Sequence, residues 1–293
     1  MEDKIISYGG QAVIEGVMMR GKHAFAVAMR APDGNIVVHQ EGLAKVYQSW
    51  FTKVPFLRGT LLLWDALGLG MKALTLSANT QTGEDEKLEG PALYATLATS
   101  LAISIGLFFL LPAGVGGLAD TYLGWPTLAH NLLEGVVRLL LLIGYIWGIG
   151  FMPEVKRLYG YHGAEHKTIN AYEAGVELTP ENVAKFPLEH PRCGTAFMLT
   201  LMLLSVLVFS ALGEMSIYWR FASRILLIPV LAGIAVEYIR WTANHLNSPL
   251  VRLLIKPNLA LQSLTTREPD SSMLEVAIES FKTMRKAEQE FVV

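Results

Sequence analysis

Four long runs of apolar residues are the strongest pattern along the chain. They cover approximately Leu93–Leu111, Val136–Met152, Ala196–Leu212 and Ala222–Ile239. A helix needs roughly 20 apolar residues to cross the hydrocarbon core of a bilayer, which is about 30 Å thick. Pro126 suits the first turn of a helix, which favours an earlier start for the second run. The pattern predicts an α-helical polytopic membrane protein with about four transmembrane helices.

Shorter patterns before the first run predict a small cytoplasmic α+β portion. Ala24–Arg30 and Asn35–Gln40 are β-prone and flank a turn sequence, so a β-hairpin is expected. Val54–Ala78 is apolar except for three charges spaced seven apart, which places these charges on one helical stripe: Arg58, Asp65 and Lys72. Such a segment is typical of an amphipathic helix that lies at the membrane interface.

Two further segments complete this organisation. Thr80–Gly90 is acidic and predicts a linker, and Ser272 with Glu275 forms a capping box for an amphipathic helix over Ser272–Gln289. The chain then divides into 1–53 (a Gly-rich motif and the hairpin), 54–92 (interfacial helix and linker), 93–152 (two spans), 153–195 (a cytoplasmic loop), 196–240 (two spans) and 241–293 (a cytoplasmic region with the last helix).

Composition supports a membrane protein and excludes some partners. Hydrophobic residues make up 52% of the chain and charged residues 17%, with a mean hydropathy of +0.37, which is unusual for a soluble domain. The net charge of −2 argues against nucleic acid as a partner. Cys193 is the single cysteine, so no intramolecular disulfide forms. The first residues lack the pattern of a cleavable signal peptide.

The distribution of Lys and Arg predicts how the spans are oriented. Pro112–Thr127 contains neither residue, whereas Pro153–Thr195 contains Lys156, Arg157, Lys167, Lys185 and Arg192. Loops rich in Lys and Arg stay in the cytoplasm. Arg220 and Arg224, in and after the turn between the last two spans, oppose this assignment mildly. We expect a multi-pass protein of the cell membrane, embedded in the lipid bilayer, with both termini and the central loop cytoplasmic.

The central loop contains the H-x-x-E-H pattern, formed by His162, Glu165 and His166. If Tyr159–Ala174 is helical and ends at Gly175, the two histidines lie one turn apart on one face. Both imidazoles then reach one tetrahedral Zn²⁺, and Glu165 is placed to act as a base on water, as in the inverted zinc-peptidase motif. The alternative is a polar helix face that packs against its neighbours.

A second pair of metal-ligand residues follows at His190 and Cys193, directly before the third span. The first amides of that helix favour the thiolate form of Cys193, which is the form that binds metal. Two ligand pairs separated by a loop are the usual plan of a zinc site. The alternative is a buried, inert Cys193 beside a solvated His190.

Four motifs resemble the YqhQ family of bacterial membrane proteins, and together they extend over nearly the whole chain: GGQAVIEGVMMRG (Gly9–Gly21), YHGAEHKTINAYEAG (Tyr161–Gly175), HPRCGT (His190–Thr195) and LTTREPD (Leu264–Asp270). The family is described as predicted metal-dependent enzymes. The resemblance therefore implies a metal site at His162, His166, His190 and Cys193, but it implies no substrate.

Several acidic and basic residues have two interpretations. Glu15 is either a further ligand or acid/base, or it belongs to a structural ion pair or a solvated edge, and we favour this second, structural interpretation. Glu173 lies seven residues beyond His166, roughly 10 Å along a helix, so it is too far away to share the ion. Glu237, Arg240 and His245 close the fourth span, where they either border the site or extend to the interface.

Two functions of different classes fit the sequence. The first is a membrane-embedded zinc-dependent hydrolase that acts at the cytoplasmic interface on a peptide or lipid-like substrate, with Glu165 as the catalytic base. The second is a non-catalytic protein in which a structural zinc supports binding of a cytosolic or membrane protein, for instance in membrane-protein biogenesis. Three protein ligands favour catalysis and four favour structure. A transporter is disfavoured because the spans hold few ionisable residues.

Overall fold

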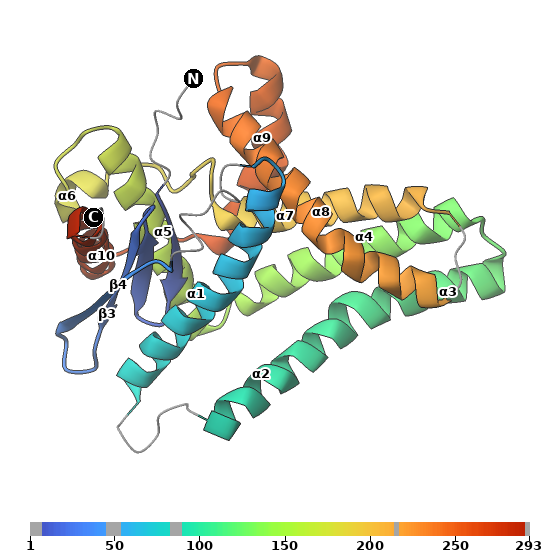
Figure 1. Cartoon of the computed structure of the whole chain (residues 1–293), viewed down its shortest axis with the longest axis horizontal. Coiled ribbons are helices and arrows are strands. Elements are labelled where there is room, and N and C mark those ends of the chain that lie inside the picture. The colour runs from blue at the N-terminus through green and yellow to red at the C-terminus, as the bar shows by residue number, and fades with distance from the viewer. Residues whose placement is uncertain (1–7, 45–53, 83–89, 214–216, 291–293) are drawn as a thin grey trace.

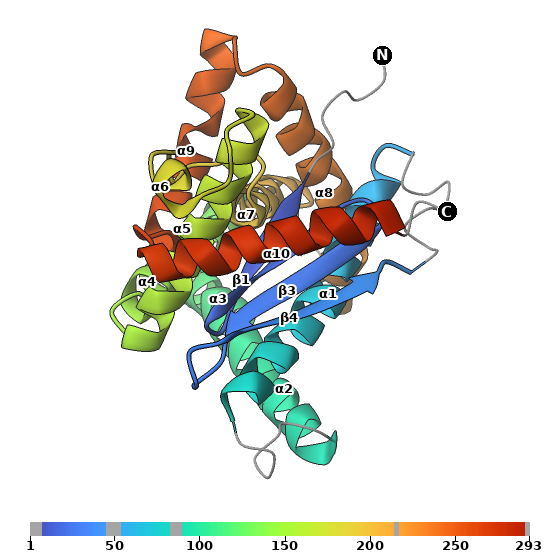
Figure 2. The same cartoon turned by 90° about the vertical axis from the view of Figure 1, so that its left-hand side faces the viewer.

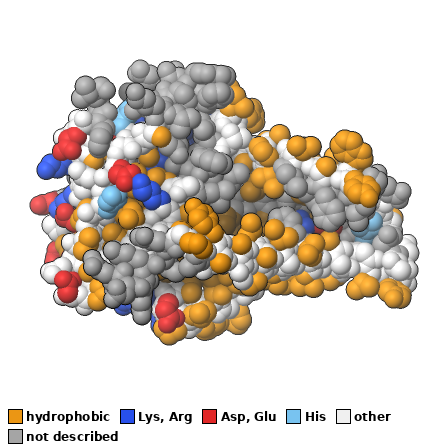
Figure 3. Space-filling view, turned by 60° about the horizontal axis from the view of Figure 1, so that its bottom comes forward, with side chains coloured by type: hydrophobic (Ala, Val, Ile, Leu, Met, Phe, Trp, Pro, Cys, Tyr) orange, Lys and Arg blue, Asp and Glu red, His pale blue; other side chains and the backbone are white. Residues whose placement is uncertain are grey.

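The computed structural model describes residues 8–44, 54–82, 90–213 and 217–290. It has two parts, a layered α/β part and a bundle of long helices that extends from it (Figure 1). Charged side chains gather on the α/β part, while the bundle presents mostly apolar side chains (Figure 3).

A four-stranded antiparallel sheet forms the centre of the α/β part, with the strand order β1-β2-β3-β4. The strands are β1 (Gly9–Val13), β2 (Gly16–Arg20), β3 (Ala24–Arg30) and β4 (Ile36–Gly42). The last two confirm the expected hairpin. The first two were not expected, because the glycines of this motif were interpreted as tight turns or sites of close backbone approach. A Cβ atom on Gly16 would lie 2.3 Å from the Ala28 carbonyl oxygen, so this glycine lets β2 and β3 pack closely.

Helices cover both faces of the sheet. On one face lie α5 (Pro153–Glu173) and α10 (Ser271–Glu290), and α10 runs across the strands (Figure 2). The C-terminal half of α1 (Leu57–Gln81) packs on the other face, where Ala73 contacts the second apolar core. The alternation of side chains along the strands supplies both cores, because Val17 and Met19 face α10 whereas Met18 faces α1.

Helix α1 also joins the sheet to the bundle. Near its start, Gly59 lies against Gly233 of α8 (Ile217–Asn244), and Arg58 makes two hydrogen bonds of 2.5 and 2.6 Å to Glu237. Lys72, near the other end, pairs with Glu41 at 2.6 Å. A helix is present where one was expected, and both of these charges bind protein partners; its position at the membrane interface stays a prediction. Asp65 lies among side chains that the structure does not describe, and most of the expected linker Thr80–Gly90 lies outside the described residues.

Among the residues that the structure describes, four helical segments are long and apolar enough to cross a membrane: Leu93–Leu123, Thr127–Ile149, Gly194–Ala211 and Leu226–Asn244. This number agrees with the sequence pattern, and such helices are compatible with a multi-pass membrane protein. The elements are α2 (Gly90–Ile105), the π-helix η4 (Gly106–Leu110), α3 (Leu111–Leu123), α4 (Thr127–Ile149), α7 (Gly194–Ala211) and α8.

The first span is longer than expected. Pro112–Thr127 was expected to be a loop, but helix continues through Pro112 to Leu123, and residues 124–126 make the turn. A proline in a helix displaces the carbonyl four residues earlier, which here belongs to Phe108. The π-helix accommodates this defect, because the Leu111 amide bonds to the Gly106 carbonyl five residues back. The released Phe108 carbonyl accepts a hydrogen bond of 3.0 Å from Arg138 Nε.

Arg138 is paired with Glu134 as the spacing predicts, at 2.5 Å, and both side chains are buried within the bundle. They thereby connect the π-helix to α4. A charged pair in an apolar environment must be well hydrogen-bonded to be stable, and the Phe108 carbonyl helps to meet this requirement.

Two features of the C-terminal region differ from expectation. A helix not expected from sequence, α9 (Pro249–Thr265), packs against α7 and α4, where Leu261 contacts Leu199 and Ile146.

The last helix is present, but its cap is Asp270, whose Oδ1 accepts the Met273 amide hydrogen at 2.9 Å. Ser272 is already helical, and Glu275 pairs with Arg30 at 2.9 Å, so these two residues form no capping box.

The contact between α1 and α8 gives a matched pair of variants. A Cβ on Gly59 would lie 2.6 Å from the Gly233 Cα, whereas a Cβ on Gly68 of the same helix meets nothing within 4 Å. Both glycine-to-alanine changes raise helix propensity, but only Gly59→Ala overpacks the contact, at a cost of about 1–3 kcal/mol. We expect Gly59→Ala to lower the thermal unfolding midpoint in detergent and Gly68→Ala to maintain or raise it. Equal midpoints would contradict this packing.

Candidate metal centre

Helix α5 holds both histidines of the H-x-x-E-H pattern. It begins at Pro153, and proline suits the first position of a helix. It ends before Gly175, whose φ of 71° lies in the left-handed region that glycine adopts easily. His162 and His166 therefore lie one turn apart on one face, with ring centroids separated by 4.4 Å. The expected helix and its end are confirmed.

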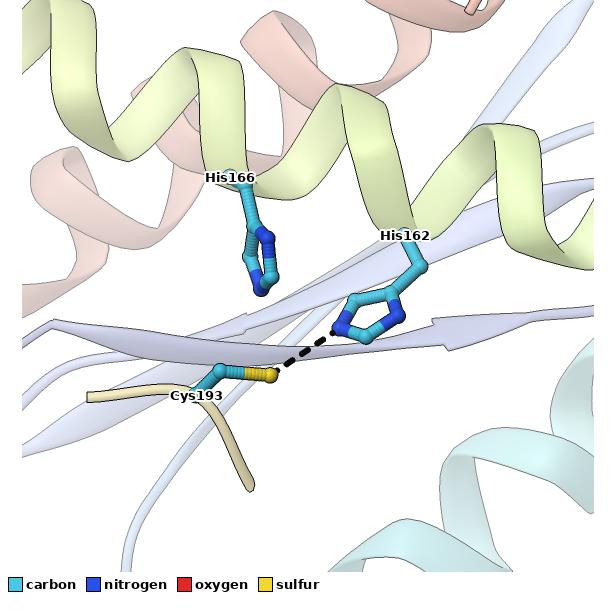
Figure 4. A group of neighbouring side chains, drawn as sticks. All are labelled: His162, His166 and Cys193. Atoms are coloured by element: carbon cyan, nitrogen blue, oxygen red, sulfur yellow. Dashed lines mark hydrogen bonds between the residues drawn. The ribbon is translucent and has the colours of Figure 1, made fainter. Parts of the chain in front are cut away.

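Cys193 meets these histidines from a different element. It is the N-cap of α7, and its Sγ accepts a hydrogen bond of 3.4 Å from the Thr195 amide. The same Sγ lies 3.2 Å from His162 Nε2. The potential ligand atoms of His162, His166 and Cys193 all lie within 4.8 Å of one another (Figure 4).

The outer nitrogens of both rings are held by backbone carbonyls. His162 Nδ1 lies 2.9 Å from the Thr265 oxygen, and His166 Nδ1 lies 2.5 Å from the Leu188 oxygen. Such bonds fix the tautomer with hydrogen on Nδ1, and they leave Nε2 free to bind a metal. His166 Nε2 is buried and has no hydrogen-bond partner among the described residues. Two imidazoles and a thiol fit a transition metal such as Zn²⁺.

Electrostatics in this cluster favour the ligand form of the cysteine. Burial alone raises the pKa of Cys193, but the hydrogen bond to His162 and the charges of the neighbouring His162 and His166 rings outweigh it and hold that pKa well below its usual value. Burial lowers the pKa of His162, and the bond to Cys193 reverses this effect and raises that pKa to about 9. Both shifts favour a thiolate on Cys193 and a proton on His162. A metal would replace the proton on His162 and bind the thiolate directly.

His190 lies beside the cluster but outside the group of converging ligand atoms. Its ring centroid is 5.7 Å from that of His166, and its Nε2 lies 3.9 Å from a carboxylate oxygen of Glu173. Gln262 of α9 fixes its backbone through hydrogen bonds of 2.8 Å to the amide and 2.9 Å to the carbonyl. Glu173 also pairs with Arg192, so it is a polar partner of this loop. Of the four expected ligands, three come together.

Glu165 is buried next to the histidines, and burial raises its pKa. One carboxylate oxygen, Oε2, is buried and has no hydrogen-bond partner in the described part of the chain. The carboxylate lies against Gly10 of β1, where a Cβ would be only 2.9 Å from Oε1. The first motif therefore packs directly on this glutamate, and the need for a glycine there explains part of its sequence.

The first motif contacts α5 a second time through Glu15. This residue occupies the turn between β1 and β2 with a φ of 52°, and its carboxylate makes two hydrogen bonds of 2.5 and 2.6 Å to Arg157. Tyr161 lies 3.2 Å from the same carboxylate. Hydrogen bonds from Arg157 lower the pKa of Glu15. The structural ion pair that we favoured is the arrangement observed.

The LTTREPD motif lies along the opposite side of α5. Besides the Thr265 carbonyl, it supplies the Arg267 carbonyl, which lies so close to Gly163 that a Cβ there would be 2.2 Å away. Glu268 pairs at 3.0 Å with Lys167, which is buried and also donates to the Ala184 and Phe186 carbonyls. Sequence reasoning missed Lys167 because its partners are distant in the chain. All four motifs thus meet at α5.

Glu237 and His245 have other partners. Glu237 binds Arg58, and His245 Nδ1 lies 2.7 Å from the Trp241 carbonyl. The interpretation that these residues border the metal centre receives no support from these contacts.

These observations describe a multi-helix protein of membrane-protein character, with a buried His-His-Cys cluster where four sequence motifs converge. The family described as "Protein of unknown function (DUF1385)" matches residues 54–287. The "Uncharacterized protein YqhQ" of Bacillus subtilis (strain 168) is 36% identical over 299 residues, which cover 96% of this chain and 93% of that protein. The chain belongs to this family, as its motifs predicted. No solved structure matches it.

Neighbouring glycines test the contact between the first motif and Glu165. Gly10→Ala would place a methyl group 2.6 Å from the Met18 carbonyl and 2.9 Å from Glu165, whereas Gly9→Ala meets nothing within 4 Å. We expect Gly10→Ala to lower the free energy of unfolding by about 1–3 kcal/mol and Gly9→Ala to change it little. Thermal unfolding in detergent measures the difference. If both variants unfold like wild type, β1 does not pack on Glu165 as described.

Proposed function

We propose that this chain is a multi-pass protein of the cell membrane, with α5 and both termini on the cytoplasmic side. The large apolar side chains of the bundle support this, since residues such as Leu140 and Leu207 are more than 60% exposed on its surface. The turn at residues 124–126 contains no Lys or Arg, whereas Lys156, Arg157 and Lys167 follow the second span.

Orientation is testable with an impermeant thiol reagent on intact cells. The native thiol is buried, so wild type gives the background labelling. We expect Trp125→Cys to be labelled from outside and Glu181→Cys to be labelled only after the membrane is opened. Labelling at 181 but not at 125 in intact cells would reverse the proposed topology.

We further propose that the cluster binds Zn²⁺ and that the protein is a metal-dependent hydrolase at the cytoplasmic membrane interface. The observation that supports this is a group of three ligand side chains beside a buried carboxylate with an unpartnered oxygen. Catalytic zinc sites use three protein ligands and keep one position open, whereas structural sites use four. His162, His166 and Cys193 would hold the ion, while His190 stays with Glu173.

In this proposal each residue near the ion has a separate role. Bound zinc supplies a Lewis acid that polarises a carbonyl and makes water more acidic. Glu165 accepts the proton of the attacking water at Oε2 and delivers it to the leaving group. The Thr265 and Leu188 carbonyls keep both rings aimed at the ion, and Gly10 sets the position of the Glu165 carboxylate. The substrate is a peptide or lipid-like molecule that reaches the interface.

A structural zinc site is the second candidate function. Burial of the cluster favours it, since His166 is fully buried and Cys193 and Glu165 are nearly so. Zinc would then hold α5 to the start of α7, and the assembled cytoplasmic part would bind a cytosolic or membrane protein. A role in membrane-protein biogenesis is one example. The two candidates share the ion but require different behaviour of Glu165.

Zinc content tests the ligand set. We expect about one Zn²⁺ per chain in protein purified without chelator, and little in His166→Ala or Cys193→Ala. His190→Ala should retain the ion if three ligands hold it, and should lose it if the site has four. His245→Ala is the matched control, since His245 contacts α8 backbone. Elemental analysis gives the ratio, and wild type without any transition metal would refute the site.

Glu165→Gln separates the enzyme from the scaffold. It keeps the size of the side chain but removes the basic oxygen, so we expect normal zinc content and folding with loss of complementation in a deletion strain. Loss of a general base costs about 10²–10⁴ in rate. His166→Ala should fail as well, but with loss of metal and of stability.

The opposite result has an equally clear meaning. If Glu165→Gln complements fully while His166→Ala and Cys193→Ala do not, the metal is structural and the hydrolase proposal fails. Failure of Glu165→Gln alone does not demonstrate hydrolysis, because Glu165 also packs on Gly10. The Gly10→Ala variant controls for this contact.

A further inference from the structure

Helices α8 and α9 form a sharp corner at the side of the bundle. Residues 245–248 make the turn, and three hydrogen bonds stabilise it, one between the two helices, one from α9 to the turn and one within the turn. The Tyr238 hydroxyl donates to the Leu254 carbonyl at 3.2 Å, Arg252 Nε donates to the Leu246 carbonyl at 2.8 Å, and the Ser248 amide donates to the His245 carbonyl at 3.0 Å. The corner is therefore a defined structure rather than a loose loop.

Large apolar side chains cover the outer surface of this corner. Trp241 is 46% exposed, Leu250 62%, Leu253 59% and Leu254 41%, and we call these four residues the corner face. The other side of α9 is buried, including Val251, Leu261 and Gln262. Leu250, Leu253 and Leu254 follow the i, i+3, i+4 spacing of one helical face. No segment that the structure describes covers this face.

The position of the corner indicates what covers it. Trp241 belongs to the last candidate span, Leu226–Asn244, so the apolar surface of that span continues into the corner face. In Figures 1 and 2 the corner projects sideways from the bundle, near the ends of the helices that adjoin the α/β part. Arg252 and Lys256, both exposed, lie on the same helix as the three leucines. Tryptophan, leucine and cations together are typical of a helix in the headgroup region of a bilayer.

We propose that the corner face lies in the cytoplasmic leaflet of the membrane that the four helices cross, with Arg252 and Lys256 beside anionic headgroups. This inference rests on the membrane insertion proposed above. In addition to the spans, which cross the membrane, the protein would then have a helix surface that lies in the plane of the membrane.

The consequence for the metal centre follows from the length of α9. Leu253 and Thr265 are 12 residues apart, roughly 18 Å along a helix. Thr265 holds the His162 ring, and Gln262 holds the His190 backbone. Helix α9, which continues through Pro257, therefore has lipid contacts at its start and metal-centre contacts at its end, so its length sets the distance between the membrane surface and the cluster. A substrate would have to reach the cluster within this distance of the headgroups.

Spin labels at three positions of the full-length protein test the proposal. Leu253→Cys probes the corner face, Leu140→Cys probes the exposed surface of a span, and Ser263→Cys probes an exposed polar position on α9. The native thiol stays in place because it is buried, and unmodified protein gives the background. The protein is reconstituted in vesicles of phosphatidylcholine and phosphatidylglycerol. The relaxation of each spin label is then measured twice, once with oxygen, which partitions into lipid, and once with a water-soluble nickel chelate.

We expect the ratio of oxygen to nickel accessibility at Leu253 to approach that at Leu140 and to exceed that at Ser263 several-fold. A lipid-like ratio at Leu140 with a water-like ratio at Leu253 would overturn the corner proposal and leave the membrane spans intact. Water-like ratios at both positions would overturn membrane insertion itself. A label at Leu253 that neither agent reaches would show that protein, rather than lipid, covers the face.

Discussion

A polar helix that is buried on nearly every side is the constraint on which this structure depends. Helix α5 holds charged or titratable groups over several turns, yet the sheet, α10, the 184–193 loop and the 265–270 segment enclose most of it. Burying a polar group without a hydrogen bond is costly. Each polar side chain on α5 therefore requires a partner, and the surrounding segments are shaped to provide one.

Most of these requirements are met by backbone groups or by single charges. Arg157 has Glu15, Lys167 has Glu268 and two carbonyls, and both histidines have a carbonyl at Nδ1. Two buried atoms of α5 have no partner within the described structure, His166 Nε2 and Glu165 Oε2. In the adjoining loop, His190 Nε2 and Arg192 Nε are also buried without a hydrogen-bond partner among the described residues. Buried polar atoms without a partner need an explanation. A metal ligand and a proton acceptor are the explanation proposed here for the two atoms of α5.

Sequence reasoning succeeded where the determining physics is local. The apolar runs, the hairpin at β3 and β4, and the two histidines one turn apart all follow from short-range periodicity. Short-range periodicity did not predict that the helix continues through Pro112, because this continuation depends on Arg138, which binds the Phe108 carbonyl from another helix. Helix α9 was missed because Pro249 and Pro257 obscure its pattern. A helix tolerates a proline in its first turn, where Pro249 lies, and α9 continues through Pro257.

The candidate site shows the same division. The i, i+4 histidines and an N-cap cysteine are visible as patterns, so His162, His166 and Cys193 were predicted. Gly10, Gln262 and Lys167, which hold Glu165, His190 and the 184–186 segment in place, were not predicted, since each depends on residues 17 to 155 positions away. His190 was grouped with the ligands by its spacing from Cys193 and by the family resemblance. Its bond to Gln262 and its proximity to Glu173, which fix its position, have no signature in a single sequence.

The π-helix before Pro112 also has a consequence for how the chain is made. In the topology proposed above, α2 and α3 emerge from the ribosome before α4, and the freed Phe108 carbonyl then lacks the Arg138 guanidinium. Arg138 and Glu134 would in turn enter hydrocarbon without that carbonyl. Leaving such groups unsatisfied in lipid costs several kcal/mol each. The first two spans are therefore expected to leave the translocon together, as a helical hairpin assembled before it meets lipid.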